Sequence, residues 1–305
     1  MQAISAVEFP LDVKWEAPSA GLHRYFVVDV FTDRPLEGNQ LGVFPDARSF
    51  RAEQMQRLAR ELNFSETVFV LPPQQAGDVR LRIFTPRHEL PFAGHPVLGA
   101  AFVIGTALQR PCVRLETGLG LVPVELSHED DRVVFGRMQQ LIPTWRPYEH
   151  EAQLLRALGV ERSGLPVEAY PNGPLHVYVE LQSEEAVAKL RPDMRALAEL
   201  DGCANCFAGS GRRWKTRMFA VTHGVVEDPA TGSAAGPLAV HLSRHGRIAF
   251  GEEIEIRQGA EVGRPSVLYA RADGSAERIE RVEVGGAAVI VARGEFRLPA
   301  LMRPD

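Results

Sequence analysis

The sequence predicts an α+β protein of two similar halves whose β-sheets are largely antiparallel. Three observations lead to this prediction. The 305 residues are enough for two domains, each with a core of its own. Short apolar and β-branched runs follow one another with mostly short connections, which favour antiparallel pairing. One pattern, a strand followed by a glycine turn and an apolar helix, occurs twice along the chain.

The composition is that of an ordinary globular protein and excludes several functional classes. Net charge is −5, whereas a nucleic-acid partner normally requires a basic stripe, so we expect none. The densest basic cluster, at 212–217, is interpreted as a solvated turn or strand edge. No run reaches the roughly 18 apolar residues of a membrane span, and acidic residues interrupt the N-terminus, so neither a membrane nor a signal peptide is expected. Three cysteines give no disulfide framework, which favours the cytoplasm.

The first 23 residues show no periodicity and are predicted to form an N-terminal extension outside the core. A first lobe is predicted over residues 24–148. Its patterns indicate strands at 25–31, 41–44, 66–71 and 79–85, an amphipathic helix at 52–62, a buried helix from 96, and a hairpin over 114–126 that turns at two glycines.

A more charged stretch at 146–163 marks the predicted domain boundary, and a second lobe is predicted over residues 149–305. Its patterns indicate helices at 151–158 and 183–189, a strand at 175–181, and strands from residue 252 to the end. A return of the last strand to the first lobe is left open.

Cys203 and Cys206 have the CxxC spacing of redox and zinc sites. A redox motif would stand between a strand and the start of a helix, and a zinc site would need a second pair. The third cysteine, Cys112, is a single sulfur far away in the sequence. We therefore interpret Cys203 and Cys206 as two small residues of the core.

The repeated pattern locates a candidate ligand site. Arg82-Ile-Phe leads into Glu89-Leu-Pro-Phe-Ala-Gly-His95, and Arg217-Met-Phe leads into Glu227-Asp-Pro-Ala-Thr-Gly-Ser233. A helix N-terminus presents free N–H groups and a partial positive charge, and glycine there allows a ligand to approach the backbone. Two such ends facing each other would hold a small carboxylate, whereas neither loop fits a dinucleotide. The alternative is that duplicated halves keep these glycines for packing alone.

Four motifs in the same order resemble the phenazine-biosynthesis isomerase family (PhzF-like). They are Asn63-Phe-Ser-Glu-Thr67, Arg82-Ile-Phe-Thr-Pro86, Glu89-Leu-Pro-Phe-Ala-Gly-His-Pro96 and Glu227-Asp-Pro-Ala-Thr-Gly-Ser-Ala-Ala235. The similarity covers nearly all of the chain from residue 24. It implies the diaminopimelate-epimerase fold, in which each of two similar lobes is an antiparallel barrel-like sheet around a central helix. It also implies a homodimer that isomerises trans-2,3-dihydro-3-hydroxyanthranilate without cofactor or metal.

The resemblance also assigns roles to individual residues. Glu66 matches the general acid/base, and His95 and Asp228 match groups that hold polar atoms of the substrate or relay a proton. The substrate-binding positions, expected to hold its carboxylate, are Ser65, Gly94, Gly232 and Ser233. The central helices are expected to begin at His95 and Ser233. Because apolar strand residues follow Glu66, we expect burial to raise the pKa of its carboxyl.

Several points depart from this interpretation or compete with it. Gln40 stands where the family pattern leads us to expect proline. Glu89 and Glu227 are expected to be structural. An epimerase or racemase of the same fold would need two opposed bases, usually cysteines, and neither glycine loop carries one. A non-catalytic small-molecule-binding protein is the second alternative, because fold alone does not establish activity.

Overall fold

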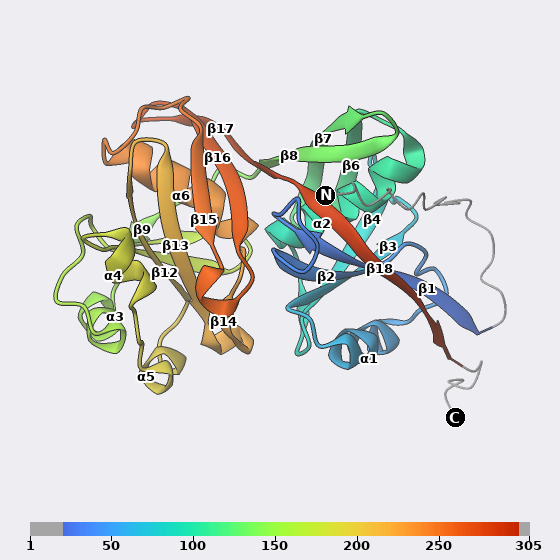
Figure 1. Ribbon diagram of the computed structural model, residues 1–305, viewed down its shortest axis with the longest axis horizontal. Helices are drawn as coiled ribbons and strands as arrows, with labels where there is room; N and C mark the ends of the chain where they lie inside the picture. Colours follow the sequence, from blue (N-terminus) through green and yellow to red (C-terminus); the bar gives the residue numbers. More distant parts are fainter. Residues whose placement is uncertain (1–20, 299–305) are drawn as a thin grey trace, which may run out of the picture.

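The computed structural model describes residues 21–298, and the chain forms two lobes that lie side by side (Figure 1). Residues 1–20 of the predicted N-terminal extension lie outside the described residues. The first strand, β1, already begins at Leu22. No helix within residues 21–298 is long and apolar enough to cross a membrane.

The first lobe contains eight strands and two helices in chain order. They are β1 (Leu22–Val30), β2 (Asn39–Phe44), α1 (Ala52–Leu62), β3 (Glu66–Leu71), β4 (Val79–Phe84), β5 (Glu89–Leu90), α2 (Gly94–Leu108), β6 (Cys112–Thr117), β7 (Gly120–Glu129) and β8 (Arg132–Gln140). The helix predicted at 52–62 and the strand predicted at 66–71 are confirmed residue for residue.

The second lobe begins after β8 with a short strand. Its elements are β9 (Arg146–Pro147), α3 (Glu151–Leu158), β10 (Glu168–Pro171), β11 (Leu175–Glu180), α4 (Glu184–Ala188), α5 (Met194–Ala198), β12 (Cys203–Ser210), β13 (Arg213–Ala220), β14 (Val225–Asp228), α6 (Gly232–Arg244), β15 (Ile254–Gln258), β16 (Ser266–Gly274), β17 (Ile279–Gly286) and β18 (Ala288–Arg297). Strand β12 was not predicted. Six of its eight residues are buried, so its two faces do not alternate in polarity.

The two lobes have the same strand pairing, which is the structural form of the repeat in the sequence. Pairs β2–β3 and β4–β6 are parallel in the first lobe, and the corresponding pairs β11–β12 and β13–β15 are parallel in the second. The remaining pairs are antiparallel, as expected. Each parallel pair is separated in the chain by helical segments, which parallel strands need for their crossover connection.

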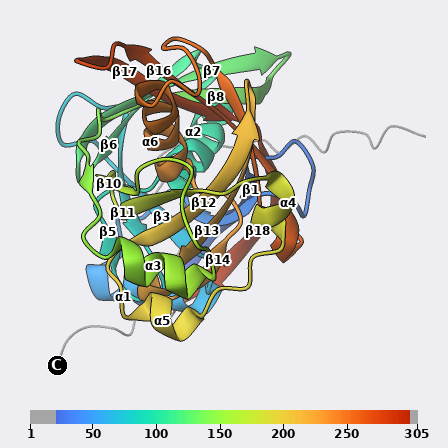
Figure 2. The same ribbon diagram turned by 90° about the vertical axis from the view of Figure 1, so that its left-hand side faces the viewer.

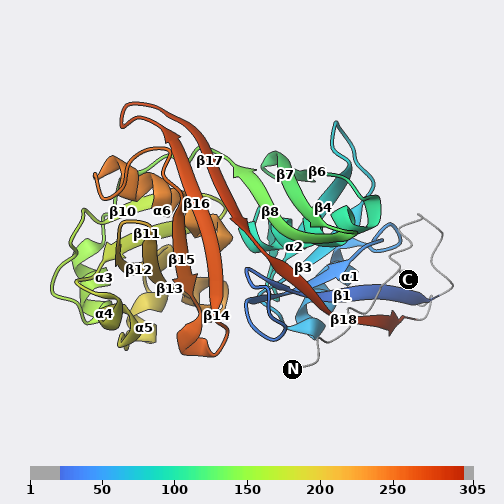
Figure 3. The same ribbon diagram turned by 45° about the horizontal axis from the view of Figure 1, so that its top comes forward.

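The chain ends of the two halves are exchanged between the lobes. Strand β8 pairs with β17, and this antiparallel pair links the lobes. Strand β18 follows β17 and pairs with β1 in the first lobe, while β9 follows β8 and pairs with β10 in the second. Figure 3 shows β17 and β18 passing from one lobe to the other. Each lobe therefore needs a strand from the other half of the chain.

Each sheet surrounds one buried helix, α2 or α6. Both helices are rich in small and apolar residues and are buried over most of their length, as is typical of a helix that is apolar on all sides. They begin at Gly94 and Gly232, one residue earlier than predicted. A Cβ atom on Gly94 would lie 2.4 Å from the backbone nitrogen of Ser233, so the two helix starts are in direct contact. In Figure 2, α6 lies in front of α2.

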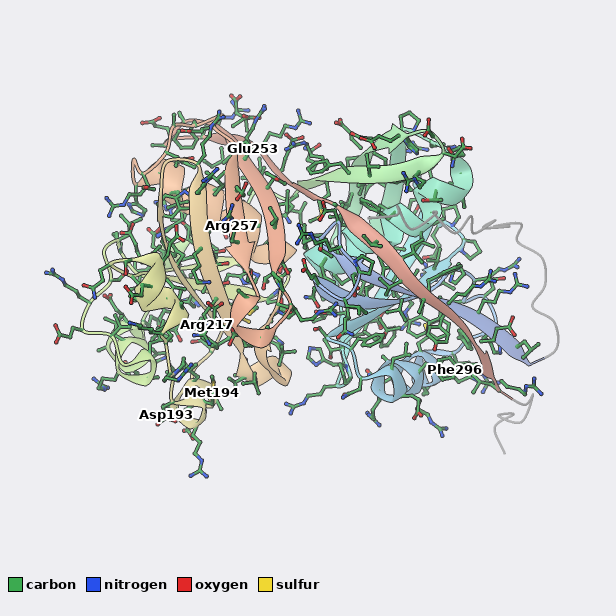
Figure 4. The ribbon with its side chains drawn as sticks, in the orientation of Figure 1. Asp193, Met194, Arg217, Glu253, Arg257 and Phe296 are labelled. Carbon is green, nitrogen blue, oxygen red and sulfur yellow. The ribbon has the colours of Figure 1, made fainter. Side chains whose placement is uncertain are left out.

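A further feature repeated in both lobes is an ion pair before each helix. Arg82 binds Glu89 at 2.6 Å in the first lobe, and Arg217 binds Glu227 at 2.7 Å in the second. Glu89 and Glu227 are therefore structural, as expected. The interpretation of 212–217 as a solvated edge is wrong for Arg217, which lies within the second lobe and is only 5% exposed (Figure 4).

Candidate active site

A pocket lies between the lobes where α2 and α6 begin, and both lobes line it. It contains about 490 Å³ of space that no atom fills, part of which is open to solvent. Six of the seven residues predicted for the site line this pocket, namely Glu66, Gly94, His95, Asp228, Gly232 and Ser233. Their roles in binding or catalysis stay predictions.

Ser65 is the residue that does not line the pocket. Its hydroxyl donates to Asn39 Oδ1 at 3.3 Å, while the neighbouring Glu66 reaches the pocket. Ser65 lies in the bend before β3, whereas Glu66 is the first residue of that strand. The geometry connects Ser65 to the site through Asn39 instead of through direct contact with a ligand.

Glu66 is the first residue of β3 and has a buried carboxyl. Its side chain is 15% exposed, and its Oε2 atom has no hydrogen-bond partner within residues 21–298. Burial raises the pKa of Glu66 well above its ordinary value, and the charge of Asp228 raises it further, in the direction expected from the sequence. A buried carboxyl oxygen without a hydrogen-bond partner from the protein is suited to exchange a proton with a ligand.

His95 lies beside this carboxyl at the start of α2. Its Nε2 atom is 3.4 Å from Glu66 Oε2 and also has no hydrogen-bond partner in the described part of the chain. Burial lowers the pKa of His95 to about 3, against a smaller opposing effect of the Gln40 backbone. The ring is therefore neutral near pH 7 and supplies a polar atom rather than a positive charge.

Asp228, at the end of β14, is held by hydrogen bonds from both lobes. Its Oδ1 accepts from Asn39 Nδ2 at 2.9 Å, and its Oδ2 accepts from the Thr231 hydroxyl at 2.6 Å. Burial raises the pKa of Asp228 to about 6, although these two hydrogen bonds lower it. Asp228 does not cap α6, since the N-cap residue is Thr231.

Asn39 and Gln258 are members of the site that the sequence analysis missed. Asn39 Nδ2 also donates to Ala230 O at 2.9 Å and lies 3.3 Å from His95 Nδ1. Gln258 Nε2 donates to Asp228 O at 2.8 Å and to the Thr231 hydroxyl at 2.9 Å. No spacing in the sequence connects residue 39 or 258 with the loop at 228–231.

The two cysteines of the CxxC spacing lie on opposite faces of β12. Cys206 belongs to an apolar core cluster, as expected. Cys203 also belongs to a buried core cluster, with Met218 and Ala220, as expected. It lines the pocket as well, which the sequence analysis did not predict. Burial raises the pKa of the Cys203 thiol to about 12, so this thiol is neutral and is a poor base near pH 7.

Within residues 21–298, one group of side chains could hold a metal ion: Glu168, His241 and His245. A cation already occupies this group, because Arg244 Nη1 is 2.7 Å from Glu168 Oε2 and the Arg244 guanidinium lies 3.9 Å from the ring of Trp145. Among the residues that the structure describes, His241 Nε2 has no partner that would orient the ring as a metal ligand. The cluster therefore fits a structural ion network better than a metal site.

Comparison with known proteins gives consistent results for sequence and structure. The family model described as "Phenazine biosynthesis-like protein" (PhzC-PhzF) matches residues 28–294. The chain is 54% identical over 278 residues to the trans-2,3-dihydro-3-hydroxyanthranilate isomerase of Pseudomonas aeruginosa, which covers 91% of this chain and 100% of that protein.

Two solved structures show the fold. A phenazine biosynthesis protein of the PhzF family from Bacillus anthracis aligns with a TM-score of 0.78 at 23% identity, covering 90% of this chain and 98% of that one. A hydroxyproline epimerase from Agrobacterium vitis aligns with a TM-score of 0.63 at 13% identity, covering 93% and 94%. The α+β fold of two similar lobes, predicted as diaminopimelate-epimerase-like, is confirmed.

Proposed function

The chain belongs to the phenazine biosynthesis-like (PhzC-PhzF) family, and from this premise we propose how it acts as an isomerase. Its substrate is trans-2,3-dihydro-3-hydroxyanthranilate, and it moves a proton from C3 to C1 of the ring. Glu66 is the general acid/base. No cofactor takes part. The observation that carries the proposal is the carboxyl of Glu66, buried in an inter-lobe pocket with Oε2 lacking a hydrogen-bond partner among the described residues.

The reaction follows from the placement of the polar groups. The substrate carboxylate binds at the helix starts, where the backbone N–H groups of Gly232 and Ser233 favour an anion. The ionised Glu66 takes the C3 proton, the double bonds shift, and Glu66 returns the proton at C1. The product is an isomer, so the reaction needs no oxidant, reductant or second substrate. His95 and Asp228 hold the hydroxyl and amino groups or relay a proton.

The raised pKa of Glu66 has a consequence for the rate. Only the ionised form can accept the C3 proton, so the active fraction of the free enzyme increases as the pH rises through this pKa. A general base works best when its pKa is near the working pH. Repulsion between Glu66 and Asp228 disfavours the doubly ionised state, so one of the two carboxyls takes up a proton first as the pH falls.

The direct test is to mix the purified protein with trans-2,3-dihydro-3-hydroxyanthranilate and follow the ultraviolet absorbance, with a metal chelator present. We expect repeated turnover that the chelator does not reduce. In single-turnover reactions with substrate deuterated at C3, part of the label is expected at C1 of the product. A change that stops at one equivalent of ligand would contradict catalysis and favour a binding protein.

An epimerase acting on a small amino acid is the second candidate, because the fold is shared with such an enzyme. It needs a base on each side of the substrate. The pocket thiol, Cys203, is a poor base because burial raises its pKa to about 12. Incubation of candidate amino acids in heavy water is expected to leave the α-carbon undeuterated.

A homodimeric assembly and a cytoplasmic location remain expectations from the sequence.

A further inference from the structure

The Ser233 hydroxyl, at the start of α6, belongs to a buried chain of side chains for which the proposed mechanism has no role. Ser233 Oγ is 3.1 Å from His176 Nε2, and His176 Nδ1 is 3.4 Å from Asn205 Nδ2. The three side chains are at most 4% exposed. A serine, a histidine and an amide in this order resemble an activated nucleophile with its base. The direction of the hydrogen bonds decides whether the serine acts in that way.

The amide of Asn205 has a fixed orientation. Its Nδ2 atom donates to the backbone carbonyl of Cys203 at 2.8 Å, and a flipped amide would place two oxygen atoms against each other. The second hydrogen of the same nitrogen points to His176 Nδ1, so Nδ1 is an acceptor. Burial lowers the pKa of His176 to about 3. The neutral ring therefore carries its single proton on Nε2.

It follows that His176 Nε2 donates to Ser233 Oγ. Nε2 already carries a proton and cannot remove the proton of the hydroxyl, so Ser233 is not an activated nucleophile. A hydroxyl that accepts a hydrogen bond keeps its own hydrogen for another acceptor. Within residues 21–298, Ser233 Oγ has no other hydrogen-bond partner, and Ser233 lines the pocket.

We propose that His176 is a positioning residue that keeps the Ser233 hydroxyl as a hydrogen-bond donor to the carboxylate of the substrate. The proposal rests on the proposed function, because it assumes that the carboxylate lies at the start of α6. There the hydroxyl adds to the N–H groups and to the partial positive charge of the helix end. A donor fixed in this way favours an anionic group over a neutral amide, so His176 contributes to specificity for acids.

The first test reads the tautomer of His176 directly. Long-range proton–nitrogen correlation spectra of protein with ¹⁵N-labelled histidine distinguish a protonated Nε2 from a protonated Nδ1, and the His176→Gln variant identifies the signals of His176. We expect the neutral Nε2–H form between pH 5 and 8. A proton on Nδ1, or a positively charged ring in this range, would overturn the proposal.

The second test compares two ligands of the same shape, the anion 2-aminobenzoate and the neutral amide 2-aminobenzamide. In His176→Leu the hydroxyl loses its fixed orientation, so 2-aminobenzoate binding should weaken by about tenfold or more, the effect of losing a hydrogen bond to a charged group. Binding of 2-aminobenzamide should change by less than about threefold, since a hydrogen bond between neutral groups contributes less. His176→Gln retains an N–H donor and should restore most of the difference.

Ser233→Ala provides the same comparison with a smaller change to the core, in case His176→Leu does not fold. Three results would each overturn the proposal. They are an equal loss of affinity for both ligands, an unchanged affinity for 2-aminobenzoate, and no binding of 2-aminobenzoate to the wild-type protein. Neither test depends on turnover. Absence of turnover with both results as expected would refute the proposed reaction alone, and a proton on Nδ1 in an active enzyme would refute the positioning role alone.

Discussion

The two helix starts that meet in the pocket have opposite polar surroundings. At the start of α2, His95 Nε2 and the neighbouring Glu66 Oε2 have no hydrogen-bond partner among residues 21–298. At the start of α6, Asp228 and Ser233 are hydrogen-bonded to several buried side chains. A buried polar atom without a partner is costly for stability. The first region is therefore suited to exchange a proton with the ligand, and the second region is suited to hold it.

This difference shows how a duplicated fold can divide its tasks. The strand pairing, the central helix, the glycine and the arginine–glutamate ion pair are the same in both lobes. The residues that follow the glycines differ, His95 in one lobe and Ser233 in the other. Changes to the partners of these residues should either remove the division or make it sharper.

The largest effect on the pH profile is expected for Asp228→Asn. The charge of Asp228 raises the pKa of Glu66, so its removal should lower that pKa. The rise of kcat/KM with pH should then move to lower pH by about one unit or more, the effect of a nearby like charge. Measurement of kcat/KM between pH 4 and 9 checks this. A profile that keeps its position would mean that the two carboxyls do not interact.

A smaller shift in the opposite direction is expected for Asn39→Leu. Asp228 loses one of its two donors, and because this hydrogen bond lowers the pKa of Asp228, that pKa should rise above about 6. The limb of the profile that belongs to Asp228 should move to higher pH. The free energy of unfolding should fall by about 1–3 kcal/mol, because buried groups lose a partner.

Asn172→Leu is a matched control for this variant. Asn172 is also buried, and its Nδ2 donates to Gln140 Oε1 at 3.0 Å and to Ser233 O at 2.8 Å. Within the described range, 21–298, it binds no carboxyl group. We expect a similar loss of stability without a shift in the pH profile. Equal shifts in both variants would indicate that Asn39 acts through general packing.

The neutral histidines predict a loss of stability in acid. The pKa of His95 is about 3 in the folded protein, against an ordinary value of 6.5. Its contribution to stability is thus complete above pH 6.5 and is lost as the pH falls toward 3. Between pH 7 and 5 the loss is about 2 kcal/mol, because stability falls by about 1.4 kcal/mol for each pH unit below the ordinary pKa of 6.5.

Glu66 and Asp228 act in the opposite direction, because a raised pKa stabilises the fold as the pH falls; for Asp228 this happens from about 6 downward. Denaturant unfolding at pH 7 and pH 5 can separate the contribution of His95 to stability from those of Glu66 and Asp228. The decrease between these values should be smaller by about 2 kcal/mol in His95→Gln than in the wild type. An equal decrease in both proteins would contradict a neutral, buried His95.

The smallest effects are expected for the two cysteines of β12. Cys203→Ala removes part of the pocket wall, so KM should rise by less than about tenfold while kcat is nearly unchanged, as for a modest loss of apolar contact. Cys206 lies in the core, so Cys206→Ala should leave KM and kcat unchanged. Sensitivity of the wild-type activity to dithiothreitol would contradict this view and would favour a redox role for the pair.

The sequence predicted those parts of the structure that depend on local patterns. The helix at 52–62 and the strand at 66–71 follow from hydrophobic periodicity, and the two glycine loops follow from the repeated motif. The reason for the glycines was only partly predicted. Besides lining the pocket, Gly94 lacks a side chain because the backbone of the second helix start occupies that space, which supports the packing alternative as well.

Contacts between segments that are distant in the sequence could not be predicted in the same way. Asn39 and Gln258 reach the loop at 228–231 from strands that are distant in the sequence, and no local period records such a contact. The exchange of β9 and β18 between the lobes also depends on tertiary packing alone. The role of His176 could not be predicted either, because it depends on the direction of two buried hydrogen bonds.

Replacement of the unpartnered carboxyl by an amide tests the proposed chemistry most directly. Glu66→Gln keeps the size of the side chain but cannot take up a proton, and Glu89→Gln is a control on an exposed glutamate of the same lobe. We expect turnover of trans-2,3-dihydro-3-hydroxyanthranilate to fall by at least ~10²-fold in Glu66→Gln, with 2-aminobenzoate binding retained, and to remain near normal in Glu89→Gln. Near-normal turnover in a folded Glu66→Gln protein would contradict the account.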